Sequence, residues 1–169
     1  MRAQQPDFAE FYRAAKDECL FAVLMSVGDR DTAQDLVAEA FARAWASWPA
    51  VSTHPAPAAW VVRTALNAGV SRWRRRRREV PVPDFAIVAD RPAADAAGGG
   101  VDPRIMAALS RLPERQRQVV ALRLFLDLDT EGTARALGIA PGTVQAHLGR
   151  AMASLRGELI PIWQEESRK

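Results

Sequence analysis

Four side chains that can recognise nucleic-acid bases follow one another at short intervals near the end of the chain: Thr143, Gln145, His147 and Arg150. They carry a hydroxyl, an amide, an imidazole and a guanidinium group, and such groups hydrogen bond to base edges in the major groove of duplex DNA. Helical spacing separates them from the apolar side of the same segment. The set therefore indicates recognition of DNA rather than catalysis.

The segment from 130 to 155 has the spacing of a helix-turn-helix. Ala134 stands where a second helix must pass close by, Gly138 where the chain needs a left-handed turn, and Val144 where the next helix needs a core anchor. Pro141 suits the first position of that second helix, which in DNA-binding proteins of this type enters the major groove. A helix pair joined by glycine also occurs in domains that bind no DNA, so the other segments must decide.

A basic segment forms a second candidate site for nucleic acid. Residues 51–78 contain seven basic and no acidic side chains. Arginines neutralise phosphates, and Asn67 can read an unstacked base. A solvated helix end or a membrane-surface patch is also basic, but the apolar side of this helix is predicted to face a protein core, which disfavours a membrane. The residues assigned to this site are Arg63, Asn67, Arg72, Trp73, Arg74 and Arg75.

An acidic stripe marks a third segment, in the helix predicted to follow Gly28. Asp31 is predicted as its N-cap, with Gln34 completing a capping box. Asp35, Glu39 and Arg43 then recur at intervals of four residues, which places them on one face. Two acids on one face can dock a basic partner surface, although a solvated face is the commoner meaning of such a stripe.

The elements that must position these sites are all predicted to be helices. Apolar residues recur at steps of three and four from Asp7 to about Val27, and again through the acidic and basic segments. Residues 79–102 carry prolines, three glycines in a row and net negative charge, which is typical of a linker. The tail from Pro161 is predicted to fray. The sequence thus predicts an all-α protein with two small helical domains, 1–78 and 103–169, joined by a flexible linker.

Several classes of function are disfavoured by composition. His54 and His147 stand far apart and Cys19 is the only cysteine, so no metal site or internal disulfide is predicted. No nucleophile is accompanied by a base, and we expect no catalytic residues and no cofactor. The 169 residues contain no run of eighteen apolar residues and no signal-peptide pattern, so we expect a cytoplasmic protein that does not bind membranes.

Three segments in this order resemble a known family. DTAQDLVAEAFARAW, then AAWVVRTALNAGVSRWRRRRR, and then LPERQRQVVALRLFLDLDTEGTARALGIAPGTVQAHLGRAMASL are similar to the extracytoplasmic-function (ECF) group of the sigma-70 family of bacterial transcription initiation factors. The resemblance covers nearly the whole chain outside the linker and the tail. It implies that residues 1–78 are region 2 and residues 103–169 are region 4, without enzymatic activity.

The resemblance also implies partners and sites. The expected partners are core RNA polymerase, through its β′ clamp helices and its β subunit, promoter DNA, and an anti-sigma factor. The family's polymerase-docking helix matches Asp35, Leu36, Glu39 and Phe41. Asn67, with Arg63 and Arg72, matches the reader of the −10 element, and the set at Thr143, Gln145, His147 and Arg150 matches the reader of the −35 element.

The chain departs from the family pattern at a few positions. Gln145 and His147 stand where a lysine and an arginine are usual, Ala140 where a serine or threonine cap is common, and Ser71 where aspartate is frequent. Two other classes of protein stay open at this point. One is a dimeric DNA-binding regulator that uses only the helix-turn-helix, and the other is a helical interaction protein with no DNA function.

Overall fold

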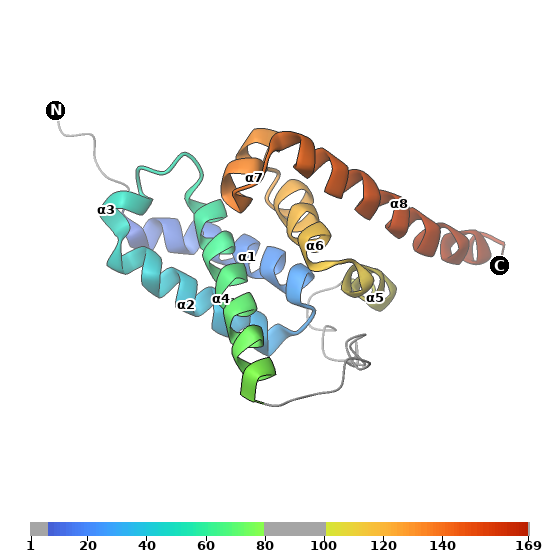
Figure 1. Cartoon of the computed structure of the whole chain (residues 1–169), viewed down its shortest axis with the longest axis horizontal. Coiled ribbons are helices and arrows are strands. Elements are labelled where there is room, and N and C mark those ends of the chain that lie inside the picture. The colour runs from blue at the N-terminus through green and yellow to red at the C-terminus, as the bar shows by residue number, and fades with distance from the viewer. Residues whose placement is uncertain (1–6, 80–100, 169) are drawn as a thin grey trace.

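The structure, a computed structural model, describes residues 7–79 and 101–168, with side chains except at 73–79, 162, 165 and 166. Every regular element in these ranges is a helix, as the sequence predicts (Figure 1). The predicted linker lies outside the described residues from 80 to 100. In chain order the elements are α1 Phe8–Val27, α2 Arg30–Ala46, α3 Trp48–Val51, α4 Pro57–Glu79, α5 Pro103–Arg111, α6 Glu114–Val120, the π-helix η2 Ala121–Phe125, α7 Thr130–Leu137 and α8 Pro141–Glu166.

The first group of helices is built from α1, α2 and α4, each of which packs against the other two. Gly28 ends α1 in the left-handed conformation at φ 77°. The N-cap of α2 is Asp29, whose carboxylate accepts a hydrogen bond from the Thr32 N–H at 2.9 Å. The predicted cap, Asp31, was wrong by two residues and lies inside the first turn. Leu36 of α2 and Val61 and Val62 of α4 are fully buried in the core.

The second group, α5 to α8, contains the predicted helix-turn-helix. Asp129 caps α7 by accepting a hydrogen bond from the Gly132 N–H at 2.6 Å. Gly138 then reverses the chain at φ 66°, a conformation that glycine adopts without strain. α8 begins at Pro141, and its Val144 and Ala151 are fully buried. The helix-turn-helix prediction is thus confirmed.

One feature of this group is a local irregularity, and another differs from the sequence-based expectation. After α6 the helix widens into η2, where the Leu126 N–H donates to the Ala121 carbonyl five residues earlier. The tail does not fray at Pro161, because α8 continues to Glu166. Glu158 binds Arg111 of α5 at 2.7 Å, and this ion pair ties the distal half of α8 to the second group.

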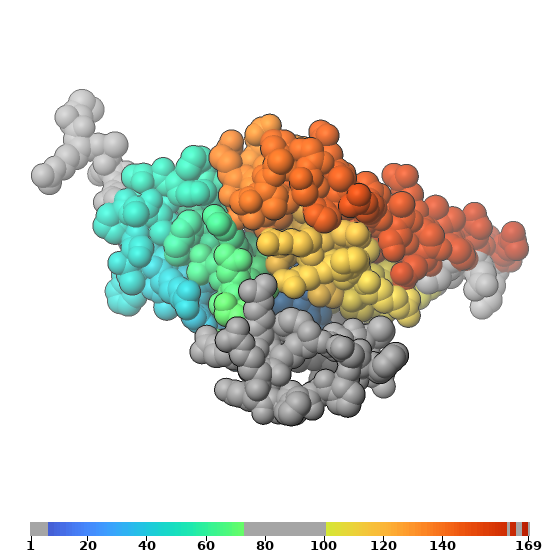
Figure 2. Space-filling model, in the orientation of Figure 1, coloured from blue at the N-terminus to red at the C-terminus, as the bar shows by residue number. Residues whose placement is uncertain are grey.

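The two groups pack against each other. α1 contacts η2, α5 and α6, and α4 contacts α7. The rings of Phe21 and Phe125 meet edge to face across this boundary, with centroids 5.1 Å apart. Buried residues from Ala15 to Ala151 form one continuous cluster, and in Figure 2 the surfaces of the two groups adjoin. The two predicted helical regions are therefore present, and buried residues of both belong to one shared core.

Candidate nucleic-acid interface

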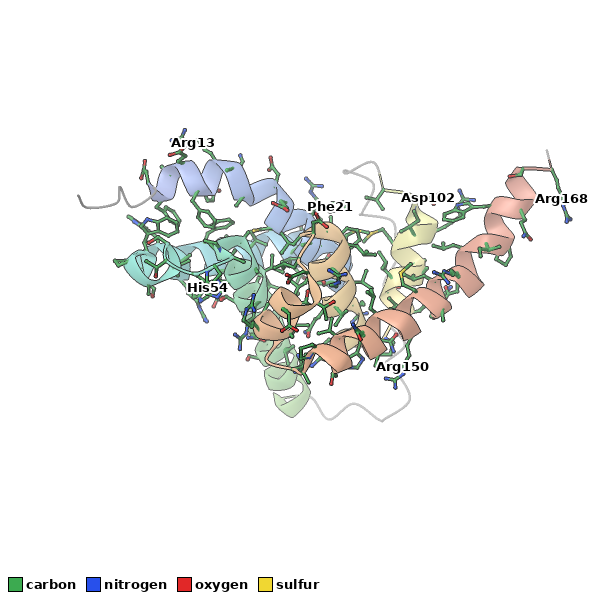
Figure 3. All side chains as sticks on the ribbon, turned by 90° about the horizontal axis from the view of Figure 1, so that it is seen from above. Arg13, Phe21, His54, Asp102, Arg150 and Arg168 are labelled. Atoms are coloured by element: carbon green, nitrogen blue, oxygen red, sulfur yellow. The ribbon has the colours of Figure 1, made fainter. Side chains whose placement is uncertain are left out.

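The outer face of α8 carries the predicted base-reading side chains. Thr143, Gln145 and Arg150 are exposed, and Figure 3 shows Arg150 pointing away from the other helices. Val144 and Ala151 have no exposed surface, so the opposite side of the helix is fixed against the core. This arrangement presents polar groups on a rigid helix to a partner outside the molecule, which is the geometry that major-groove recognition needs.

His147 differs from the rest of this set. It is half-buried, and its Nδ1 atom is shielded from solvent without a hydrogen-bond partner among the described residues. The imidazole lies at the edge of the buried side of α8, next to the half-buried Leu148. The Nδ1 atom of His147 is therefore not accessible to DNA. Gln145 and Arg150 are exposed and are more accessible to base edges than His147.

The second predicted DNA site surrounds a hollow of about 170 Å³ between α2 and α4. Asn67 is exposed at this hollow. The lining residues are Glu39, Arg43, Asn67, Ala68, Ser71 and Arg72. The structure therefore brings Asn67 and Arg72 together, as the sequence predicts, and joins to them two residues of the acidic stripe on α2.

The other residues assigned to this site lie elsewhere or outside the described part. Arg63 is exposed nearer the helix-turn-helix, where its Nη2 atom would lie 3.9 Å from a Cβ placed on Gly138. The side chains of Trp73, Arg74 and Arg75 lie outside the described residues, although α4 continues through these positions as a helix. The described site thus depends on Asn67, Arg72 and the neighbouring face of α2.

Glu39 binds two arginines at the edge of the hollow. Its Oε1 atom lies 2.5 Å from Arg43 Nη2, one turn further along α2. Its Oε2 atom lies 2.6 Å from Arg72 Nη2 on α4. Helical spacing predicted the first pair but not the second, because Glu39 and Arg72 are 33 residues apart in the sequence and only the fold brings them together.

The residues assigned to a polymerase-docking surface divide into two kinds. Asp35 is exposed and Glu39 is partly exposed, so both can meet a partner. Leu36 and Phe41 are 0% and 3% exposed and belong to the core. In the structure these two side chains hold α2 in place, and their contact with polymerase stays a prediction.

The described residues contain no group of three side chains that could hold a metal ion. Burial, with a smaller effect of Glu18, raises the pKa of the Cys19 thiol to about 12, so the thiol stays protonated and acts as a core residue. Within 7–79 and 101–168, none of the helices has the length and apolar character needed to cross a membrane.

Comparison with known proteins decides the family. Residues 12–79 match the family model for sigma-70 region 2, and residues 103–155 match the model for sigma-70 region 4. The chain is 35% identical over 156 residues to the RNA polymerase sigma-E factor of Streptomyces coelicolor, which covers 91% of this chain and 86% of that protein. The chain belongs to the ECF group of the sigma-70 family.

Other relatives of this sigma factor agree. It is 31% identical over 137 residues to the ECF sigma factor SigL of Mycobacterium tuberculosis, covering 79% of this chain and 77% of SigL. Among solved structures it resembles the sigma factor RpoE in a complex with the anti-sigma factor NepR from Bartonella quintana, with a TM-score of 0.76 and 26% identity. That match covers 90% of this chain and 96% of RpoE, so it spans both groups of helices.

Membership of the family establishes the general activity. This sigma factor is not an enzyme; it binds core RNA polymerase and DNA and directs promoter-specific initiation of transcription. The two alternative classes are set aside, because region 2 and region 4 both match, in order, over most of the chain.

Proposed function

We propose that this sigma factor reads its promoter with two described surfaces. Residues 1–78 act as region 2, which binds polymerase and the −10 element, and residues 103–169 act as region 4, which binds the −35 element, with 79–102 as the linker. The exposed amide of Asn67, beside Arg72 in the hollow between α2 and α4, is the observation that carries the region 2 assignment.

The −10 element is the part of the promoter that suits this hollow. A base that leaves the duplex stack loses a few kcal/mol of stacking and pairing, and a protein offsets this loss with hydrogen bonds and stacking contacts. Asn67 offers both a donor and an acceptor, and Arg72 lies beside it for a backbone phosphate. We therefore assign Asn67 to base capture and Arg72 to phosphate contact.

Replacing Asn67 with alanine is expected to slow promoter opening by about tenfold, since a lost base contact is worth roughly 1–3 kcal/mol. Binding of the closed, duplex promoter should change less than twofold. Permanganate reactivity of unpaired thymines in the −10 region measures opening, and an electrophoretic shift at low temperature measures duplex binding. Gln164→Ala removes another exposed amide, on the distal part of α8, and serves as the matched control. Equal permanganate reactivity in the two variants would remove Asn67 from the site.

The −35 element is assigned to the exposed face of α8. Thr143, Gln145 and Arg150 stand on the second helix of the helix-turn-helix, whose inner side is held by Val144 and Ala151. Ala140 has no side-chain oxygen to cap this helix, and Pro141 supplies only the helical φ. The start of this helix therefore lacks the stabilisation that a serine or threonine cap would give it.

Polymerase docking is assigned to the acidic face of α2, against the β′ clamp helices, with the β subunit meeting region 4. Asp35→Asn is expected to weaken binding to core polymerase several-fold, mainly through a slower association rate, because an exposed charge steers encounter more than it holds the complex. Asp17→Asn removes an equally exposed acid from α1 and should leave the rate unchanged. Biolayer interferometry at two salt concentrations measures both rates, and equal rates for the two variants would contradict the docking assignment.

We also propose an anti-sigma factor as a partner. Support comes from the similarity to RpoE, which was solved in a complex with the anti-sigma factor NepR. The similarity spans both groups of helices. An anti-sigma factor that contacts both groups at once would stabilise the packed arrangement described above, because a partner stabilises the conformation that it binds.

A further inference from the structure

Glu39 lies between the two proposed surfaces of region 2, the polymerase-docking face of α2 and the hollow between α2 and α4. It lies one helical turn after Asp35, on the face of α2 proposed for polymerase, and it also lines the hollow that holds Asn67. Each of its carboxylate oxygens binds one guanidinium group, from Arg43 on its own helix and from Arg72 on α4. The side chains are 31% exposed for Glu39, 57% for Arg43 and 39% for Arg72, so the cluster is open to partners.

This cluster works against DNA binding. Among the residues whose side chains the structure describes, Arg43 and Arg72 are the basic ones that line the hollow, and both are bound to the same acid. A phosphate that approaches them must compete with the Glu39 carboxylate and is also repelled by it. The bond is nevertheless breakable, because ion pairs at this degree of exposure are weak and screened by salt.

We propose that Glu39 is a charge lock that couples polymerase docking to DNA capture. In the free sigma factor it occupies Arg43 and Arg72 and keeps single-stranded DNA weakly bound. When polymerase docks on α2, a basic group of the polymerase binds Glu39 and frees both arginines for phosphates. The coupling half of this inference rests on the proposed docking of α2, and the lock itself rests only on the geometry of the three residues. Because linkage is reciprocal, captured DNA also strengthens polymerase binding.

The size of the effect follows from counterion release. Each phosphate contact with single-stranded DNA makes the slope of log affinity against log salt concentration steeper by about 0.7. Each contact therefore makes the affinity about fivefold higher at 0.1 M salt than at 1 M salt. Freeing one or both arginines should therefore tighten binding of single-stranded DNA by about 5- to 25-fold and steepen the slope by about 0.7–1.4.

The test uses the full-length sigma factor and Glu39→Gln, which keeps the shape of the side chain and removes its charge. Fluorescence anisotropy with an oligonucleotide of the −10 non-template strand gives affinity and salt slope, first for the free factor and then for the assembled holoenzyme. The free variant is expected to bind at least fivefold tighter than the wild type, with the steeper slope. In holoenzyme assembled at a polymerase concentration that saturates both proteins, so that loss of the Glu39 contact does not limit assembly, the two DNA affinities should agree within twofold, because polymerase already holds Glu39 in the wild type.

Two controls separate a lock from a simple change in net charge. Asp17→Asn makes the same charge change on α1, away from the hollow, and should tighten binding less than twofold. Adding Arg72→Gln to Glu39→Gln should remove most of the gain. Equal tightening by Asp17→Asn, or weaker binding by Glu39→Gln, would overturn the lock; the second result would mean that Glu39 holds the arginines in the binding position.

The holoenzyme measurement distinguishes failure of the coupling from failure of the docking proposal. One outcome is that the fivefold difference in DNA affinity between Glu39→Gln and the wild type persists in the holoenzyme, while Asp35→Asn weakens polymerase binding. This result would overturn the coupling and leave docking on α2 in place. If the gap persists and neither Asp35→Asn nor Glu39→Gln changes polymerase affinity, the docking proposal itself fails and the lock in the free factor stands alone.

Discussion

Replacing Leu36 with alanine is expected to lower the free energy of unfolding by about 2–5 kcal/mol. Leu36 has no exposed surface, and its Cδ1 atom lies 3.1 Å from the point that a Cβ on Gly69 would occupy. Leu36 of α2 thus packs directly against Gly69 of α4 and fills the space that a side chain there would need. Truncation leaves a cavity that Gly69 cannot fill, so the loss of packing adds to the loss of hydrophobic transfer.

Urea denaturation followed by circular dichroism at 222 nm measures this change. Leu124→Ala is the matched control, because Leu124 is 52% exposed and its truncation should cost less than about 1 kcal/mol. The two groups of helices share a core, so both variants should unfold in one transition. A loss for Leu36→Ala no larger than that for Leu124→Ala would contradict the burial of Leu36 and return it to the docking surface.

Replacing Arg150 with alanine is expected to have the largest effect on promoter choice. Its guanidinium is exposed on the outer face of α8, and a bidentate contact from arginine to a base is worth about 1–3 kcal/mol of discrimination. Selectivity for the preferred −35 sequence over one with that base changed should fall by about 5- to 150-fold. Transcription at the same promoter with a scrambled −35 element should change much less.

Competition between two templates in a single run-off reaction measures this selectivity directly. Arg156→Ala removes another exposed arginine from the same helix, about two turns further on, and lies just beyond the residues that match region 4. It should lower overall binding slightly and keep the template preference. The same loss of preference in both variants would show that α8 contributes only charge.

Local patterns were sufficient to predict the main helices and the helix-turn-helix, but not the short α3, the π-helix η2 or the extension of α8 beyond Pro161. Ala134, Gly138 and Val144 each have a steric or conformational reason to stand where they do, and these reasons act within a few residues. The start of α2 was missed by two residues because Asp29 and Asp31 both suit an N-cap, and only the hydrogen bond from the Thr32 N–H to Asp29 distinguishes them. Such ambiguity is inherent in a segment with two acids so close together.

The candidate sites were less predictable, because they depend on contacts between distant segments. The bond from Arg72 to Glu39 has no signature in spacing, and a family motif does not show which of its members are buried, as Leu36 and Phe41 are. The contact between the two groups did leave a signal. Residues 22–25 of α1 are all apolar and all buried, and a helix that is apolar all round must be covered on every side.

This complete coverage of the end of α1 affects how the protein is made. The last turns of α1, with Phe21, are covered in part by η2, α5 and α6, which begin no earlier than Pro103. At about 5–20 residues per second, a ribosome needs about 4–15 s to add the residues between Val27 and Pro103. During this interval the nascent chain presents an apolar helix end that its own finished half cannot bury, and it is then most exposed to chaperones and proteases.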